Sequence, residues 1–413
     1  MDLIHERSAG IDISKRDAKV AIRAPGKRPG TFTTTVTTWG ATTNEILALR
    51  EMLLAERVTT VVMEATSDYW KPFYYLFEDV LPVMLVNAKA ARNIPGRKTD
   101  VSDAAWLAQL GAHGLLRACF VPPEPVRQLR DLTRARTLAT QDRTREIHRL
   151  EKFLESTGIK LSSTASELTG VSARAMLEAL VAGERDPQVL ADLARGTLRR
   201  RLPELVEALT GRFTDHHAFI CRMHLERIDS MTEWIDQLTA RIEEAMSPFR
   251  AARDFLATIP GVSTTVADTV VAETGADMSR FQTPGRLCSW AGLVPGHNES
   301  AGRVKSSKTR PGNRYLKGAL GTAALSIARH PKNTYLGARY KRIAARRGRT
   351  KALVATEHAI LEAAWHMLAQ GECYQDPGSD SLTRMDPARA KNNAIRHLKA
   401  LGYNVTLSPT VAA

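Results

Sequence analysis

Hydrophobic and polar residues follow two different spacings between residues 8 and 115. Short runs rich in β-branched residues are typical of strands, and they occur at 8–14, 19–23, 31–38, 58–64 and 83–86. Stretches with apolar residues at every third or fourth position are typical of helices, and they occur at 42–56, 70–77 and 100–113. This order of strands and helices predicts an α/β domain with a mixed sheet.

The middle of the chain is helical and strongly charged. Three prolines mark the exit from the α/β domain, and a long polar helix is predicted over 126–155. A second long helix begins near residue 218, and its apolar positions form a heptad seam at Ile228, Met231, Ile235, Leu238, Ile242 and Ala245. The seam predicts a helical hairpin or a dimerising coiled coil, so we expect a helical coiled-coil arm over 121–249.

The remainder of the chain is predicted to be mainly helical. It opens with an apolar helix–turn–helix pattern, continues through a basic stretch and ends in an apolar helix over 352–368. The tail is rich in Gly, Asp, Pro and Ser and carries one short basic helix. We therefore expect the chain to have four parts, at 1–120, 121–249, 250–370 and 371–413.

The distribution of charge changes this picture. Lys and Arg number 58 against 44 Asp and Glu, which gives a net charge of +14. The stretch 300–356 carries fifteen Lys or Arg and no acid, so the other residues sum to −1. A positive charge this concentrated favours a polyanionic partner such as DNA or RNA. The basic residues that we expect to contact it are Arg303, Lys305, Lys308, Arg310, Arg314 and Lys317.

Several other classes of protein are disfavoured by composition. No run approaches the roughly eighteen apolar residues of a membrane span, and the first residues include acids and no apolar signal segment. We therefore expect no membrane partner. The four cysteines are far apart and form no CxxC pair, which disfavours a disulfide scaffold or a zinc ribbon and fits a reducing cytoplasm.

Four acidic residues are candidates for a metal site. Asp12 lies between isoleucines in the first predicted strand, Glu64 ends a later strand, and Asp100 and Asp103 share one face of a predicted helix. Each acid alone is explained by a turn or a helix cap. If strand ends and a packed helix bring the four together, they would repel one another unless they hold a divalent metal. Mg²⁺ takes oxygen ligands and assists phosphoryl transfer, and an RNase H-like fold arranges its acids in this order.

Serines in the basic stretch offer a second candidate site. Ser300 lies on a Gly-rich loop, and Ser306 and Ser307 follow among Lys and Arg. Such a serine is either a solvated hydroxyl that contacts phosphate or a nucleophile that attacks a phosphodiester. In the second case, nearby arginines would stabilise the developing charge. Composition alone favours the first interpretation.

Six short motifs resemble those of one family and occur in the same order. Three are similar to the DEDD motifs of an insertion-sequence transposase family with a RuvC-like N-terminal domain, at 10–12, 63–66 and 98–104. Three are similar to the C-terminal transposase domain of that family, at 259–262, 291–295 and 312–316. The resemblance implies an α/β RNase H-like (RuvC-like) N-terminal domain, a helical arm and a mainly α C-terminal domain that contains a serine nucleophile.

This resemblance also implies a mechanism. Family members are site-specific DNA recombinases that excise and insert their element. By this resemblance the Mg²⁺ ligands are the four acids Asp12, Glu64, Asp100 and Asp103, and Ser300 forms a covalent bond to DNA. Members often have Gly directly after the nucleophilic serine, whereas here Ala301 stands in that position, which leaves Ser306 and Ser307 as alternatives.

The partners implied by the resemblance are nucleic acids and further copies of the chain. In such bridge-RNA-guided recombinases, a structured non-coding guide RNA pairs with donor and target DNA, so base pairing selects the sequence. The composite site is completed between subunits, which implies a homo-oligomer, either a dimer or a tetramer, in the bacterial cytoplasm.

Three other functions remain open on the sequence. A Holliday-junction resolvase would use the same four acids but would leave the basic stretch unexplained. A sugar-kinase or actin-like ATPase would use residues 10–15 as a phosphate loop, but the second phosphate loop and the adenosine-binding Gly-Gly segment of that class are missing. A non-catalytic RNA- or DNA-binding protein would explain the charge but not the acids.

Overall fold

The protein forms two compact units, residues 1–122 and 123–413. The computed structural model describes residues 3–88, 91, 93–94, 102–296, 298–331, 333–384 and 387–408. Asp100, one of the four predicted acids, therefore lies outside the described residues.

The first unit contains a mixed five-stranded sheet, as predicted. Its strands are β1 (Ser8–Ile13), β2 (Asp17–Pro25), β3 (Phe32–Gly40), β4 (Thr60–Glu64) and β5 (Val83–Val86). They lie in the order β3-β2-β1-β4-β5. β2 is antiparallel to both β1 and β3, whereas β4 is parallel to β1 and β5 is parallel to β4.

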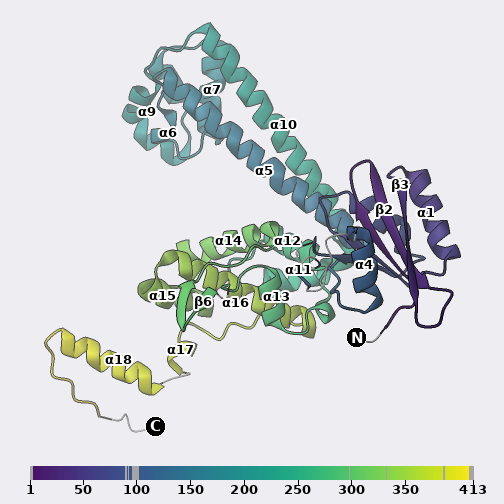
Figure 1. The fold of residues 1–413 in the computed structure, drawn as a ribbon. Coiled ribbons are helices and arrows are strands. Elements are labelled where there is room, and N and C mark those ends of the chain that lie inside the picture. The colour runs from purple at the N-terminus through teal and green to yellow at the C-terminus, as the bar shows by residue number, and fades with distance from the viewer. Residues whose placement is uncertain are drawn as a thin grey trace. The chain divides into compact units, whose positions relative to one another are not determined.

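Helices cover both faces of this sheet (Figure 1). They are α1 (Thr43–Ala55), α2 (Trp70–Phe77) and α4 (Asp103–Ala112). Because side chains alternate along a strand, Ile11 and Met63 pack with α1 and α2 on one face, whereas Val62 packs with Leu107 of α4 on the other. The position of α4 defines the face on which the predicted acids lie.

Gly10 allows α4 to lie directly against β1. A Cβ atom at this position would be 2.1 Å from the carbonyl oxygen of Ala104 and 2.4 Å from the nitrogen of Ala108. The hydroxyl of Ser8 donates to the carbonyl of Ala108 at 2.9 Å, and the backbone nitrogen of Ile4 donates to Ala112 at 2.9 Å. These contacts show that α4 runs antiparallel to β1, so its first turn lies near the carboxyl end of that strand.

The second unit begins with a pair of long helices, α5 (Glu124–Ser156) and α10 (Asp215–Ala245), which run side by side (Figure 1). The heptad positions predicted on α10 are all buried or half-buried. Polar contacts also join the two helices: Glu146 is fully buried and lies 2.7 Å from Nδ1 of His224, and Nε of Arg143 donates to Thr232 at 2.7 Å. The pair is therefore a hairpin within one chain, one of the two arrangements that the seam predicted.

Shorter elements complete the hairpin at one end. They are α6 (Leu161–Thr164), α7 (Val171–Ala182), α8 (Pro187–Asp192), the 3-10 turn η1 (Gly196–Arg201) and α9 (Leu202–Leu209). Their apolar side chains share a core with α5 and α10 that includes Leu154, Met176 and Leu205.

The part of the second unit after the hairpin is mainly helical, as predicted. Its elements are η2 (Ser247–Phe249), α11 (Arg250–Ala257), α12 (Thr264–Thr274), η3 (Met278–Arg280), α13 (Pro284–Trp290), β6 (Asn298–Ser300), β7 (Arg303–Ser306), α14 (Arg314–Arg329), α15 (Tyr335–Arg347), α16 (Arg349–Gln370), α17 (Ser381–Arg384) and α18 (Pro387–Ala400). Leu256, Val270, Leu320 and Ile360 belong to their common core. Within the described residues, no helix combines the length and the apolar character that crossing a membrane requires.

Candidate functional site

Asp12 and Glu64 occupy neighbouring positions on adjacent strands. The parallel register of β1 and β4 pairs Ile11 with Met63, so Asp12 and Glu64 are the next residues along the two strands. Alternation places both on the face that packs against α4, because Gly10 and Val62 lie two residues earlier on that face. Glu64 is 5% exposed, and Asp12 is half-buried. Two carboxylates thus lie on one face at the carboxyl ends of two strands.

Asp103 lies toward the same end of β1. It is the first residue of α4, which begins here because the Ser102 hydroxyl caps the helix by accepting from the nitrogen of Ala105 at 3.2 Å. The following residue, Ala104, is the one whose carbonyl lies against Gly10. Three of the four predicted acids are therefore carried by elements that meet at one corner of the sheet.

The donor set of this corner suits Mg²⁺. Within the described part of the chain, no three His, Cys, Asp or Glu side chains form a group that could hold a metal ion. Mg²⁺ is nevertheless usually bound by only one or two carboxylates together with water and substrate phosphates. Asp12 and Glu64 would supply such a pair of oxygen donors.

Ser300 ends the first strand of a β-hairpin in the second unit. It pairs with Arg303 across the turn, and the two turn residues, Ala301 and Gly302, have φ angles of 50° and 73°. Positive φ at both turn positions is what a two-residue type I′ turn requires. An alanine in this conformation costs about 1 kcal/mol, whereas glycine does not have this penalty. The position of Ala301, which departs from the family pattern, is thus the first residue of a tight turn, and Ser300 is exposed beside it.

The two alternative serines differ in their surroundings. Ser306 ends β7 and is half-buried, and its hydroxyl accepts from the nitrogen of Lys308 at 3.1 Å. Ser307 is exposed. Within the described residues, no hydrogen bond to the Ser300 hydroxyl is found, so this hydroxyl is open to a ligand.

The predicted basic residues extend from the hairpin to α14. Arg303 and Lys305 are exposed and alternate along β7, which places them on one face of the strand. Lys308 and Arg310 are exposed in the loop that follows. Beyond them, Arg314 is exposed at the start of α14, whereas Lys317 is half-buried and its Nζ donates to Thr309 at 3.3 Å.

Two of the sequence motifs contact each other through their backbone atoms beside this loop. A Cβ atom at Gly312 would be 2.4 Å from the carbonyl oxygen of Ala291, and one at Gly292 would be 2.8 Å from that of Arg310. Gly292 also has a φ of 74°, a conformation that favours glycine. The motifs at 291–295 and 312–316 therefore form one structural unit, in which each glycine makes room for the other segment.

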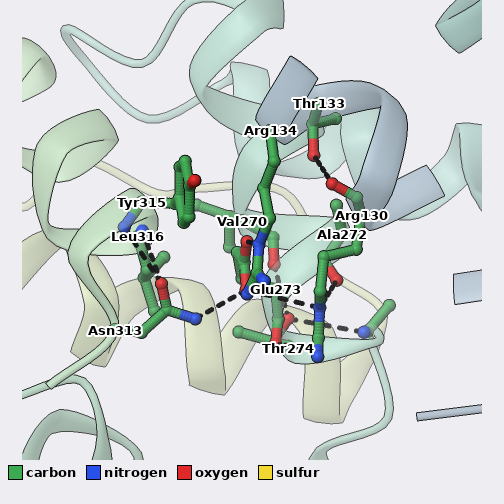
Figure 2. A network of polar contacts seen from close by, with 11 residues as sticks. Arg130, Thr133, Arg134, Val270, Ala272, Glu273, Thr274, Asn313, Tyr315 and Leu316 are labelled. Carbon is green, nitrogen blue, oxygen red and sulfur yellow. Dashed lines mark hydrogen bonds and ion pairs between the residues drawn. The ribbon is translucent and has the colours of Figure 1, made fainter. Parts of the chain in front are cut away.

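A buried carboxylate joins α5, α12 and α14 (Figure 2). Glu273 is fully buried and accepts from Nε and Nη2 of Arg134 at 2.7 and 2.8 Å. Nε of Arg130 lies 3.3 Å from the same carboxylate, and Nδ2 of Asn313 donates to it at 2.6 Å. Oδ1 of Asn313 in turn caps α14 by accepting from the nitrogens of Tyr315 and Leu316.

This network changes the electrostatics of Arg134. Burial by itself lowers the pKa of Arg134, but the hydrogen bonds and charge of Glu273 outweigh it, so the pKa is raised above its ordinary value. The guanidinium also lies 4.7 Å from the centroid of the Tyr315 ring. The Tyr315 ring thus contacts a charged group.

A second buried ion pair joins the same two helices. Nη2 of Arg136 donates to Asp268 at 3.0 Å, and both side chains are almost fully buried. Burial raises the pKa of Asp268, and the hydrogen bond from Arg136 opposes that effect only in part. Sequence reasoning missed both pairs, although two acids among the Val, Ala and Thr residues of 264–274 are a signal that buried cations lie nearby.

Comparisons with known proteins agree with the motifs. A family model described as transposase, of the IS110 DEDD type, matches residues 9–159. A second model, described as transposase IS116/IS110/IS902 family, matches residues 253–341. The two matches together cover more than half of the chain. The chain belongs to the IS110 transposase family.

A mycobacterial protein is similar to this transposase over much of its length. It is the insertion element IS900 uncharacterized 42 kDa protein of Mycobacterium paratuberculosis, and it is 28% identical over 300 residues. The similarity covers 67% of this chain and 73% of the relative. Because transposases process DNA, this IS110 transposase is a DNA-processing enzyme with DNA as a partner.

The predicted sites of the transposase fall within the two matches. The four acids lie inside the first match, that of a DEDD family whose members typically use a divalent metal. Ser300 and the basic residues from 303 to 317 lie inside the second.

Proposed function

We propose that this transposase is a site-specific recombinase of an insertion sequence that cuts and rejoins DNA through a serine nucleophile. The observation that carries the proposal is the pairing of Asp12 and Glu64 on one sheet face, together with an exposed Ser300 beside basic residues in the second unit. The strand order β3-β2-β1-β4-β5, with two parallel strands following three antiparallel ones, supports an RNase H-like (RuvC-like) first unit. We interpret 121–249 as the coiled-coil arm, 250–370 as the C-terminal domain and 371–413 as a tail.

The acids would hold Mg²⁺ beside the reacting phosphate. Asp12, Glu64, Asp100 and Asp103 are the proposed ligands, and the metal would supply charge stabilisation to the phosphate oxygens. The oxygen of Ser300 would bond to phosphorus while the deoxyribose oxygen leaves, and the serine proton would end on that leaving oxygen. Arg303 would stabilise the negative charge that develops on the phosphate.

The remaining partners follow from charge and from the family resemblance. The fifteen cations of 300–356 support binding of donor and target DNA, and we propose that a structured non-coding guide RNA binds there as well. The acids and the serine belong to different units of the chain. We propose a dimer or tetramer in which groups from different copies cooperate.

The proposal is tested by a search for the covalent intermediate. The chain is incubated with its flanking DNA, guide RNA and Mg²⁺, and protein–DNA adducts are sought on denaturing gels. We expect an adduct in the wild type, in Ser306→Ala and in Ser307→Ala, and none in Ser300→Ala. An adduct that persists in Ser300→Ala would assign the nucleophile to another residue. Metal-dependent nicking without an adduct in the wild type would favour the resolvase-like function.

The contribution of the basic hairpin is tested by salt dependence. Replacing Arg303 and Lys305 together with Ala is expected to reduce the slope of log affinity against log salt by about 2, because each phosphate contact releases close to one counterion. Arg241→Ala is the matched control, since this arginine is exposed on α10. A slope equal to that of the control would mean that the DNA contacts lie elsewhere.

A further inference from the structure

A cleft of about 370 Å³ lies between the end of α13 and the start of α14. Its lining residues are Arg134, Trp290, Gly312, Asn313, Arg314 and Tyr315. Neither the proposed metal site nor the serine hairpin includes it. Its volume is at the small end of the range for ligand sites, which suits a single nucleotide better than a duplex.

The walls of this cleft are held in place before any ligand arrives. Asn313 is fixed at both ends, by Glu273 at 2.6 Å and by the two α14 nitrogens that it caps. Arg134 is held by two hydrogen bonds to the same buried carboxylate. Gly312 lies tightly against the backbone of residue 291, so the floor has no room to shift. A preformed site avoids much of the ordering cost of binding.

The charge of the cleft favours an anion. Arg130 and Arg134 both contact the carboxylate of Glu273, so two guanidiniums lie beside one buried carboxylate. Arg314 adds another at the rim, where it is exposed. No acidic side chain is among the residues that line the cleft.

Aromatic rings supply the second component of nucleic-acid recognition. Trp290 is half-buried and ends α13 in the wall of the cleft. The Tyr315 ring is contacted by the guanidiniums of Arg134 and Arg314, at 4.7 and 4.8 Å from its centroid. The Trp290 ring also contacts that of Phe281, with the centroids 5.4 Å apart. Trp290 carries the largest aromatic surface in the lining, so we take it as the ring that stacks against a base. A positive rim next to an aromatic face is the combination by which proteins bind single strands.

We propose that this cleft binds one unstacked nucleotide of a single-stranded DNA or RNA segment, with the base against Trp290 and its phosphate at Arg314. A base inside a duplex is stacked and paired, and it could enter the cleft only if it were first extruded. The inference rests on the proposed function only in that the chain handles nucleic acid. It does not depend on the metal site or on Ser300.

The test compares affinities for single strands and duplexes in EDTA, where metal-dependent cleavage does not interfere. Labelled 12-nucleotide DNA and RNA strands and the matching duplex DNA are titrated by fluorescence anisotropy. Trp290→Leu is expected to weaken binding of the DNA strand, the RNA strand or both about tenfold, because one base–aromatic stack is lost. The affinity for the duplex is expected to change less than about twofold. The strand whose binding is weakened, DNA or RNA, identifies the nucleic acid that supplies the nucleotide.

Matched variants separate the cleft from general effects. Trp234→Leu removes a tryptophan that is 59% exposed on α10 and should leave all affinities unchanged. Arg314→Gln, at an exposed position that should not affect folding, is expected to weaken the same strand as Trp290→Leu and to reduce its salt slope by about 1. Unchanged single-strand affinity in both Trp290→Leu and Arg314→Gln would overturn the proposal. Equal losses of affinity for the single strand and for the duplex would also overturn it. Because no cleavage occurs in EDTA, these results stand whether or not the adduct is found.

Discussion

Replacing Asp12 with Asn or Glu64 with Gln is expected to reduce Mg²⁺-dependent strand cleavage by about a thousandfold or more. Each substitution keeps the shape of the side chain and removes its negative charge. Asp12 and Glu64 follow paired residues on two parallel strands, so loss of either carboxylate would remove one of two neighbouring groups that we propose as metal donors. Without the metal, the charge that develops on the phosphate oxygens is no longer stabilised.

The experiment measures initial rates of DNA cleavage and, separately, DNA affinity. Affinity is expected to stay within about threefold of wild type, because phosphate contacts by Lys and Arg dominate binding. Glu51→Gln is the control, since this glutamate is 65% exposed on α1, which covers the opposite face of the sheet. Cleavage at a near wild-type rate in either variant would contradict the proposed metal role.

Replacing Glu273 with Gln is expected to lower the free energy of unfolding of the second unit by about 3 kcal/mol, because a buried ion pair loses one partner. Both carboxylate oxygens accept from donors in the native structure. A glutamine must direct its NH₂ group at one of these donors. Two hydrogen-bond donors would then face each other without an acceptor between them. The guanidiniums of Arg130 and Arg134 would also lose their buried counter-charge, and Asn313 would lose the contact that orients its cap of α14.

Urea unfolding followed by circular dichroism measures this change. Glu244→Gln provides the comparison, since this glutamate is 66% exposed and its ion pair with Arg241 lies on the surface of α10. A surface pair of this kind contributes roughly 0.5 kcal/mol. If the Glu273 and Glu244 variants unfold at similar urea concentrations, the buried network does not stabilise the unit.

The elements of the fold followed from local spacing. Runs of β-branched residues predicted all five strands of the first sheet, and the apolar steps on α10 predicted the face that packs against α5. Such patterns are readable because alternation along a strand and the helical repeat are properties of neighbouring residues. The start of α4 at Asp103 depends on the Ser102 cap, which the sequence did not single out.

The position of the acids was only partly accessible to sequence reasoning. The candidates Asp12 and Glu64 came from charges placed in apolar strands, and their shared face then followed from the register of β1 and β4. That register joins residues about fifty positions apart, and the close approach of α4 at Gly10 joins residues about a hundred positions apart. Asp100 lies outside the described residues, so its role stays a prediction.

By itself, the sequence determined the strands of the first sheet, the two long helices, the concentration of positive charge and the family, because each of these depends on residues close together in the chain. The hairpin of β6 and β7 was not among its predictions. Only the tertiary structure decided that Arg134 pairs with Glu273, which is 139 positions away, and that Gly292 and Gly312 meet. The physical reason is that such pairs form where packed faces exclude water, and a buried charge must then find a partner among the side chains brought there. The cleft beside Trp290 is a product of the same packing, because its walls come from α5, α13 and α14.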